Sequence, residues 1–293
     1  MRRRTFLSAL PAGALAATAA QARQASPAAR PTEAAPAPAR PADPYAGVGI
    51  GDRISGPKFM GRSTVWGANG AAATAHPAAS LIGIDTLRRG GSAIDAAIAI
   101  NAALGFLEPV ANGIGGDAYC MLWDPKQKKV VGLNGSGSSP RGLSLEIARS
   151  KAIHGYLPRY GAVTVNVPGT VDAWWSAHQR YGKLPWKEVL LPVAELCEQG
   201  VPVPQVIAYY LERNMAAFDR GQIPIEENEN RKRIWAAGGA TPKVGEIFAN
   251  PYLGKTLRMI AEGGRDAFYN GPIADQIEAY FKRIGGWMTR ADM

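Results

Sequence analysis

The chain has 293 residues, of which 46% are hydrophobic and 19% charged, a balance that supports one large or two medium globular domains and excludes a disordered or coiled-coil protein. Its formal net charge of +9 includes three arginines at positions 2–4, and the densest remaining basic run, residues 231–233, follows a glutamate-rich stretch. Such a mixed, solvated surface argues against nucleic acid as a partner.

The first 22 residues have the composition of an export signal. Basic residues precede an apolar stretch over 6–20, and residues 20–22 form the small-x-small pattern of a cleavage site. Residues 3–7, Arg-Arg-Thr-Phe-Leu, are similar to the twin-arginine signal of bacteria. We therefore expect cleavage after residue 22, a periplasmic or secreted protein, no stable membrane span after cleavage, and a disordered Ala/Pro-rich tether over 23–44.

The folded part is expected to be one domain over residues 45–293. A first helix is predicted over 78–89, where two glycines then stop it. A second helix begins at Ser92, which forms a capping-box pattern with Asp95, and continues through an alanine-rich stretch. Polar residues interrupt that stretch before it reaches the length of a membrane span, so it is predicted to be a buried core helix.

A glycine-rich turn, GIGGD at 113–117, follows the second helix. It is not a phosphate-binding loop, because no Lys-Ser or Lys-Thr follows it and because it leads from a helix into a strand. Gly113, Gly115 and Gly116 are therefore predicted to form a structural corner that needs positive φ angles or close packing, with a direct functional role as the alternative. Two strands joined by a turn at 124–125 are predicted next. The second half of the chain is predicted to be mostly helical with breaks, one of them at AEGGRD, residues 261–266.

The histidines and cysteines do not indicate a metal or cofactor. His76, His154 and His178 are far apart in the sequence, so no metal site is expected. Cys120 and Cys197 stand among apolar neighbours, where buried free thiols are expected more than a disulfide.

Several motifs in chain order resemble the large subunit of the γ-glutamyltransferase family, over about residues 64–293. They are His76-Pro77, the run RRGGSAIDAA at 88–97, Glu108-Pro109, GIGGD at 113–117 where the family has GIGGG, VPGTVDAWW at 167–175 and the segment that begins at Thr256. The resemblance implies an α+β chain that is part of a four-layer αββα N-terminal-nucleophile hydrolase sandwich. It also implies an enzyme that transfers or hydrolyses γ-glutamyl or related acyl amides such as glutathione, without a cofactor.

The substrate-side loop departs from the family pattern. Family members carry an Asp-Gly-Arg-Glu-x-Ala-Pro type segment whose arginine holds the substrate α-carboxylate, whereas this chain has NGSGSSP at 134–140 with Ser136 at the arginine position. Arg141 lies nearby and either substitutes in part or is a surface residue. Asn134, Ser136 and Arg141 are therefore the candidate substrate-binding residues, and the segment is more similar to the acylase-type branch of the family.

The family's nucleophile is also missing. It is a threonine in a Thr-Thr-His type motif at the start of the small subunit, and no such motif occurs in this sequence. We expect no catalytic residue in this chain, which would be an inactive large-subunit fragment of a zymogen, or a truncated product, whose partner is the missing small subunit. It should expose an apolar surface. The alternative is a non-catalytic binding or assembly module that keeps part of the fold.

Overall fold

The computed structural model describes residues 6–8, 65–221, 225–226 and 228–293. The regular elements lie in residues 70–293 together with the backbone of residues 6–8, while residues 9–69 form a separate unit of which only 65–69 are described. The predicted tether and almost all of the predicted export signal lie outside the described residues.

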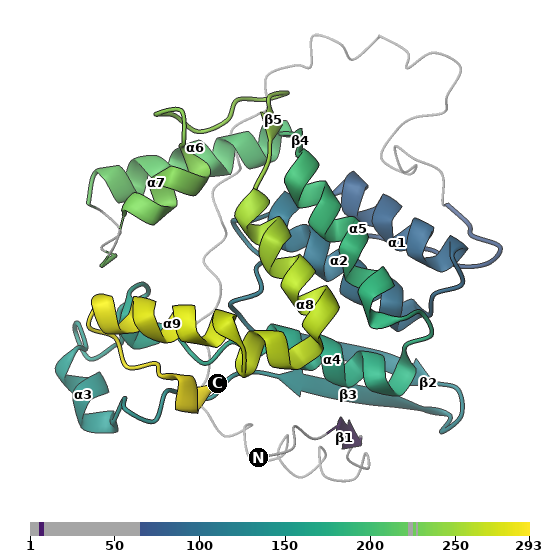
Figure 1. The fold of residues 1–293 in the computed structure, drawn as a ribbon, viewed down its shortest axis with the longest axis horizontal. Helices are drawn as coiled ribbons and strands as arrows, with labels where there is room; N and C mark the ends of the chain where they lie inside the picture. The colour runs from purple at the N-terminus through teal and green to yellow at the C-terminus, as the bar shows by residue number, and fades with distance from the viewer. Residues whose placement is uncertain (1–5, 9–64, 222–224, 227) are drawn as a thin grey trace, which may run out of the picture. The chain divides into compact units, whose positions relative to one another are not determined.

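Helices dominate the described chain (Figure 1). The helices are α1 Pro77–Arg88, α2 Ala93–Leu107, α3 Leu145–Ser150, α4 Thr170–Tyr181, α5 Trp186–Gln199, α6 Gln205–Asp219, α7 Glu229–Trp235, α8 Pro251–Tyr269 and α9 Pro272–Arg283, with short 3-10 turns at Ala162–Thr164 and Arg290–Asp292. The strands are β1 Phe6–Ser8, β2 Ala118–Asp124, β3 Lys129–Gly135, β4 Val201–Pro202 and β5 Ile247–Phe248.

The two predicted N-terminal helices are confirmed, and each has a local reason to begin where it does. Pro77 occupies the first turn of α1, and Nδ1 of His76 accepts a hydrogen bond from the N–H of Ala78 at 3.2 Å. The predicted capping box of α2 is present, with Ser92 and Asp95 exchanging hydrogen bonds of 2.8 and 3.1 Å.

Asp95 is fully buried, and Oδ2 also accepts the N–H groups of Lys183 and Leu184 at 2.9 and 3.1 Å. One carboxylate therefore caps α2 and fixes the start of the segment that leads into α5.

The main sheet is three-stranded and antiparallel, in the order β1-β3-β2, with Cys120 opposite Leu133. The predicted hairpin is confirmed: Oδ1 of Asp124 accepts the N–H groups of Lys126 and Gln127 at 2.9 and 3.0 Å and closes the turn. Because strand side chains alternate, Cys120, Leu122 and Leu133 face the helices.

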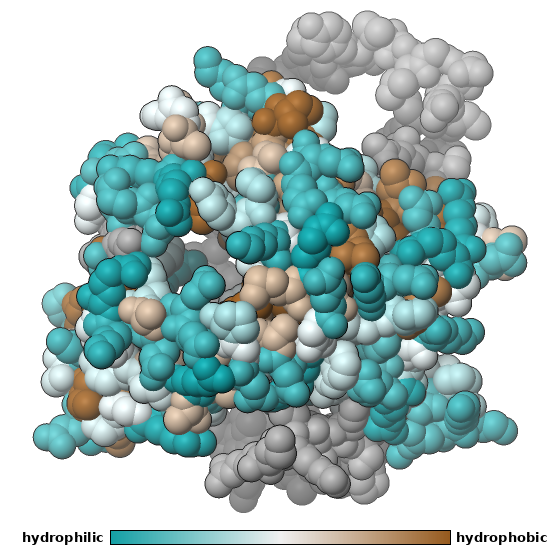
Figure 2. Space-filling model, in the orientation of Figure 1, coloured by the Kyte–Doolittle hydropathy of each residue, from teal (hydrophilic) through white to brown (hydrophobic). Residues whose placement is uncertain are grey.

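The core lies between that face of the sheet and the packed helices α2, α4, α5 and α8 (Figure 1). Fully buried members include Phe106, Val171, Leu190 and Ile260. A predicted break in the second half is confirmed at Gly264, whose φ of 65° kinks α8. Hydrophilic residues dominate the view in Figure 2, with hydrophobic ones scattered among them.

The opposite face of the hairpin is apolar and has no covering layer among the described residues. Tyr119, Met121 and Trp123 are 68, 81 and 60% exposed, and Val130 pairs with Trp123 on the neighbouring strand. In the described chain, helices thus cover one side of the three-stranded sheet and its other side is open, while β4 and β5 form a separate two-stranded sheet.

Candidate functional site

The loop that leaves β3 carries the predicted substrate-binding residues. Oδ1 of Asn134 accepts the N–H of Ser136 at 2.9 Å, which turns the chain sharply at the end of the strand. The structure thus brings Asn134 and Ser136 together at the end of β3.

Asp117, which the sequence analysis did not single out, organises this loop. Oδ1 accepts the N–H of Gly137 at 2.8 Å and Oδ2 accepts the hydroxyl of Ser136 at 3.3 Å. Asp117 ends the GIGGD turn, at the position where the resembling family motif has its last glycine. That departure is the sequence signal by which Asp117 could have been found.

Gly137 lies against the segment before α4. A Cβ on Gly137 would lie 1.6 Å from the carbonyl oxygen of Val167, so only glycine fits there. The N–H of Val167 in turn donates to the carbonyl of Ser138 at 2.9 Å. The loop is therefore held from two sides, by Asp117 and by the chain at Val167.

The glycines of the GIGGD turn do not have the backbone angles or the close packing that the sequence predicts. Gly113, Gly115 and Gly116 have no positive φ, and a Cβ on Gly113 or Gly115 would meet no atom within 4 Å. The predicted need for left-handed backbone or tight packing is therefore wrong within the described residues. The turn instead presents the carbonyl of Gly116, which accepts the N–H and hydroxyl of Thr170 at 3.0 and 2.8 Å and so caps α4 from outside.

Tyr269 completes the cap of α4. Its hydroxyl donates to the carbonyl of Pro168 at 2.7 Å and accepts the N–H of Asp172 at 3.1 Å. The guanidinium of Arg265 pairs with the Asp172 carboxylate and stacks on the Tyr269 ring, 4.4 Å from its centroid. This cluster fixes the segment on which the substrate-side loop rests.

Arg141, the third predicted residue, is directed to the C-terminal turn. Its N–H donates to Oδ1 of Asp292 at 2.9 Å, and its Nε lies 4.0 Å from the same oxygen, with the side chain 79% exposed. Burial raises the pKa of Asp292, but hydrogen bonds from the N–H groups of Arg141 and Thr289 outweigh it and hold the pKa below its usual value.

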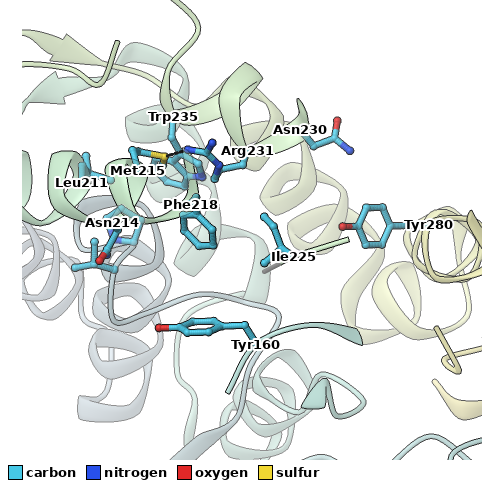
Figure 3. A pocket seen from close by; sticks show the side chains of 12 residues that line it. Tyr160, Leu211, Asn214, Met215, Phe218, Ile225, Asn230, Arg231, Trp235 and Tyr280 are labelled. Atoms are coloured by element: carbon cyan, nitrogen blue, oxygen red, sulfur yellow. Dashed lines mark hydrogen bonds between the residues drawn. The ribbon is translucent and has the colours of Figure 1, made fainter. Parts of the chain in front are cut away.

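A separate cleft of about 470 Å³ opens between α6, α7 and Tyr160 (Figure 3). Its one central cation, Arg231, is already neutralised, because its guanidinium contacts Asp219 at 2.6 Å and Asn228 at 2.7 Å and stacks on Phe218. The cleft is thus lined by a mixture of aromatic, aliphatic and amide side chains around an arginine that is already paired, and it does not include the substrate-side loop.

The described part of the chain contains no cluster of three or more His, Cys, Asp or Glu that could hold a metal ion. Both cysteines are free, with Cys197 buried and Cys120 half-buried. Within the same ranges no helix combines the length and apolarity needed to cross a membrane.

Comparison with known proteins gives a consistent family. A family model described as Gamma-glutamyltranspeptidase matches residues 79–293. A curated relative, "Glutathione hydrolase proenzyme" of Bacillus subtilis, is 33% identical over 230 residues, which cover 78% of this chain and 38% of the relative. The chain thus spans well under half the length of that relative.

Two solved structures share the fold. The cephalosporin acylase from Bacillus halodurans has a TM-score of 0.74 at 40% identity, covering 83% of this chain and 45% of that one. The gamma-glutamyltranspeptidase from Pseudomonas nitroreducens, complexed with L-DON, has a TM-score of 0.67 at 30% identity, covering 77% and 64%. These matches confirm the predicted fold class, an α+β part of the N-terminal-nucleophile hydrolase sandwich.

Proposed function

Because this chain belongs to the gamma-glutamyltranspeptidase family, we propose that it is the large-subunit part of an enzyme that hydrolyses or transfers acyl groups of amides. The observation that carries the proposal is the family match over residues 79–293, which includes the GIGGD turn, the substrate-side loop and the capped start of α4. The named relatives are hydrolases, so a non-catalytic binding module is not favoured.

In the complete enzyme the attacking group would come from a second segment. We expect an N-terminal threonine there, whose hydroxyl attacks the amide carbonyl while its α-amine takes the proton, giving an acyl-enzyme that water or an amine acceptor then releases. The described chain supplies the other side of the site. We propose that the acyl group lies against the loop that the hydrogen bonds of Asn134, Ser136 and Asp117 hold in place.

The partner that we propose is the remaining part of the same protein, bound as a second sheet. The support is the open face formed by Tyr119, Met121 and Trp123, together with a chain that covers only 34 to 41% of the curated relatives it matches. Removal of residues 1–22 would also take away β1 and free the edge of β3 for a further strand.

The localisation proposal rests on residues 1–22 alone. We expect export by the twin-arginine route followed by cleavage after residue 22. N-terminal sequencing of the mature protein should then begin at Arg23, and a protein that retains residues 1–22 would contradict the proposal.

The enzyme proposal is tested on the full-length precursor. We expect it to split into two chains, the smaller beginning with threonine, and to hydrolyse acyl p-nitroanilides. Replacing that threonine with alanine should abolish both the splitting and the hydrolysis, while leaving the precursor folded by circular dichroism. A single unprocessed chain without hydrolysis would reject the enzyme and support a binding module.

A further inference from the structure

Asp117 places an exposed negative charge at the substrate-side loop. Its carboxylate accepts two hydrogen bonds, from the N–H of Gly137 at 2.8 Å and from the hydroxyl of Ser136 at 3.3 Å. A carboxylate can accept about four hydrogen bonds, so Asp117 can still accept hydrogen bonds from groups outside the loop. Both donors are neutral, so the hydrogen bonds orient the charge without cancelling it.

No cation of the described residues compensates this charge. No ion pair joins Asp117 to a Lys, Arg or His within that part of the chain. The nearest arginine in sequence, Arg141, instead makes its hydrogen bond and ion pair with Asp292. Ser136, at the position where the family motif carries arginine, is neutral and is held by Asp117.

We propose that Asp117 determines acyl-group specificity, so that the enzyme prefers acyl chains that are neutral or carry an amine and rejects those with a free carboxylate at their far end. The inference rests on the proposed amide hydrolysis. Two carboxylates about 5 Å apart repel each other enough to change a rate about four-fold at the dielectric constant of water and more than about a hundred-fold at that of a protein surface. An amine on the acyl chain gains from the same charge.

The test uses four p-nitroanilides that differ by one group each: γ-glutamyl, with carboxylate and amine; glutaryl, with carboxylate only; 4-aminobutyryl, with amine only; and butyryl, with neither. For the processed full-length enzyme we expect kcat/KM to be highest for 4-aminobutyryl and lowest for glutaryl. Asp117→Asn keeps the size of the side chain and one oxygen that can accept the N–H of Gly137, while its NH2 group can donate to the Ser136 hydroxyl oxygen. In this variant the ratio of kcat/KM for 4-aminobutyryl to that for glutaryl should fall at least about five-fold.

The matched control is Asp85→Asn on α1, which removes one exposed negative charge that pairs with Arg88. It should leave the substrate order unchanged. A purely structural role of Asp117 would lower kcat/KM for all four substrates alike, and this result would overturn the inference.

A second measurement needs no variant. Raising the salt concentration from about 0.05 to about 0.5 M should shrink the ratio of butyryl to glutaryl hydrolysis, because the charges near the exposed carboxylate become screened. A salt-independent ratio, or a wild-type preference for glutaryl over butyryl, would overturn the inference and leave the proposed hydrolase intact. Failure to hydrolyse any of the four compounds would reject both.

Discussion

The hydroxyl of Tyr269 holds the start of α4, and its removal gives a sharp test of the fold. The residue is 1% exposed, and its hydroxyl both donates a hydrogen bond to the carbonyl of Pro168 and accepts one from the N–H of Asp172. In Tyr269→Phe the ring remains, so no cavity forms and Arg265 can still stack on it. The substitution therefore removes the hydroxyl with its two buried hydrogen bonds and keeps the ring.

The expected cost follows from which backbone groups lose their partner. Asp172 is the third residue of α4, whose N-cap is Gly169 and provides no side-chain acceptor. Losing the acceptor for that N–H costs about 0.5–2 kcal/mol, as for a missing N-cap. The unpaired carbonyl of Pro168 adds about 1 kcal/mol. We therefore expect a loss of roughly 2 kcal/mol in the free energy of unfolding.

The assay is urea unfolding of the full-length protein, followed by fluorescence, with the free energy extrapolated to water. Tyr209→Phe is the control, because Tyr209 is 57% exposed and its hydroxyl makes no hydrogen bond within the described residues. A loss below about 0.5 kcal/mol for Tyr269→Phe, or an equal loss in the control, would refute the capping role.

Three further substitutions or conditions give separate tests. Gly137→Ala should lower acyl hydrolysis at least about ten-fold, because the added Cβ has no room and displaces the loop. Gly238→Ala is the control and should have little effect, because a Cβ there meets no atom within 4 Å. Equal activity of the two variants would contradict the close approach of Gly137 to Val167. Burial and a nearby glutamate raise the pKa of Cys197 to about 12, so mass spectrometry should find it unmodified by iodoacetamide until urea is added, while the half-buried Cys120 reacts first. Burial holds the pKa of His76 below its ordinary value of 6.5 in the folded protein. As the pH drops through about 6.5, His76 therefore takes up a proton in the unfolded chain before it does so in the folded one, and the free energy of unfolding should fall. His76→Asn, which keeps a capping acceptor, should flatten that part of the pH profile, and an unchanged profile would exclude His76 as its source.

The elements that sequence reasoning located correctly are those fixed by neighbouring residues. The Ser92–Asp95 capping box and the Asp124 turn each depend on groups two or three residues apart, so the pattern alone predicts them. The kink at Gly264 is similar, because each of two consecutive glycines weakens a helix by about 1 kcal/mol relative to alanine.

The contacts that build the site were missed because they join distant parts of the chain. Asp117 meets Gly137 across 20 residues, and Tyr269 meets Pro168 across 101. No local period or spacing encodes such pairs. The glycine turn shows the same limit: its position was predicted, but its carbonyl's role as a cap for α4 depends on where a helix 54 residues later begins.

One long-range feature could have been predicted from β2 itself. An antiparallel strand with one solvated face alternates apolar and polar residues. Strand β2, Ala118–Asp124, instead carries apolar side chains on both of its faces. Cys120 and Leu122 face the helices, and the outward side chains are Tyr119, Met121 and Trp123. Such a strand is suited to burial on two sides. Covering the three outward side chains is worth about 1.5–3 kcal/mol each, so a second layer would add roughly 5–9 kcal/mol. That gain is comparable to the whole stability of a typical domain, so the sheet of this chain is expected to reach its full stability only when the remaining part of the enzyme packs against it.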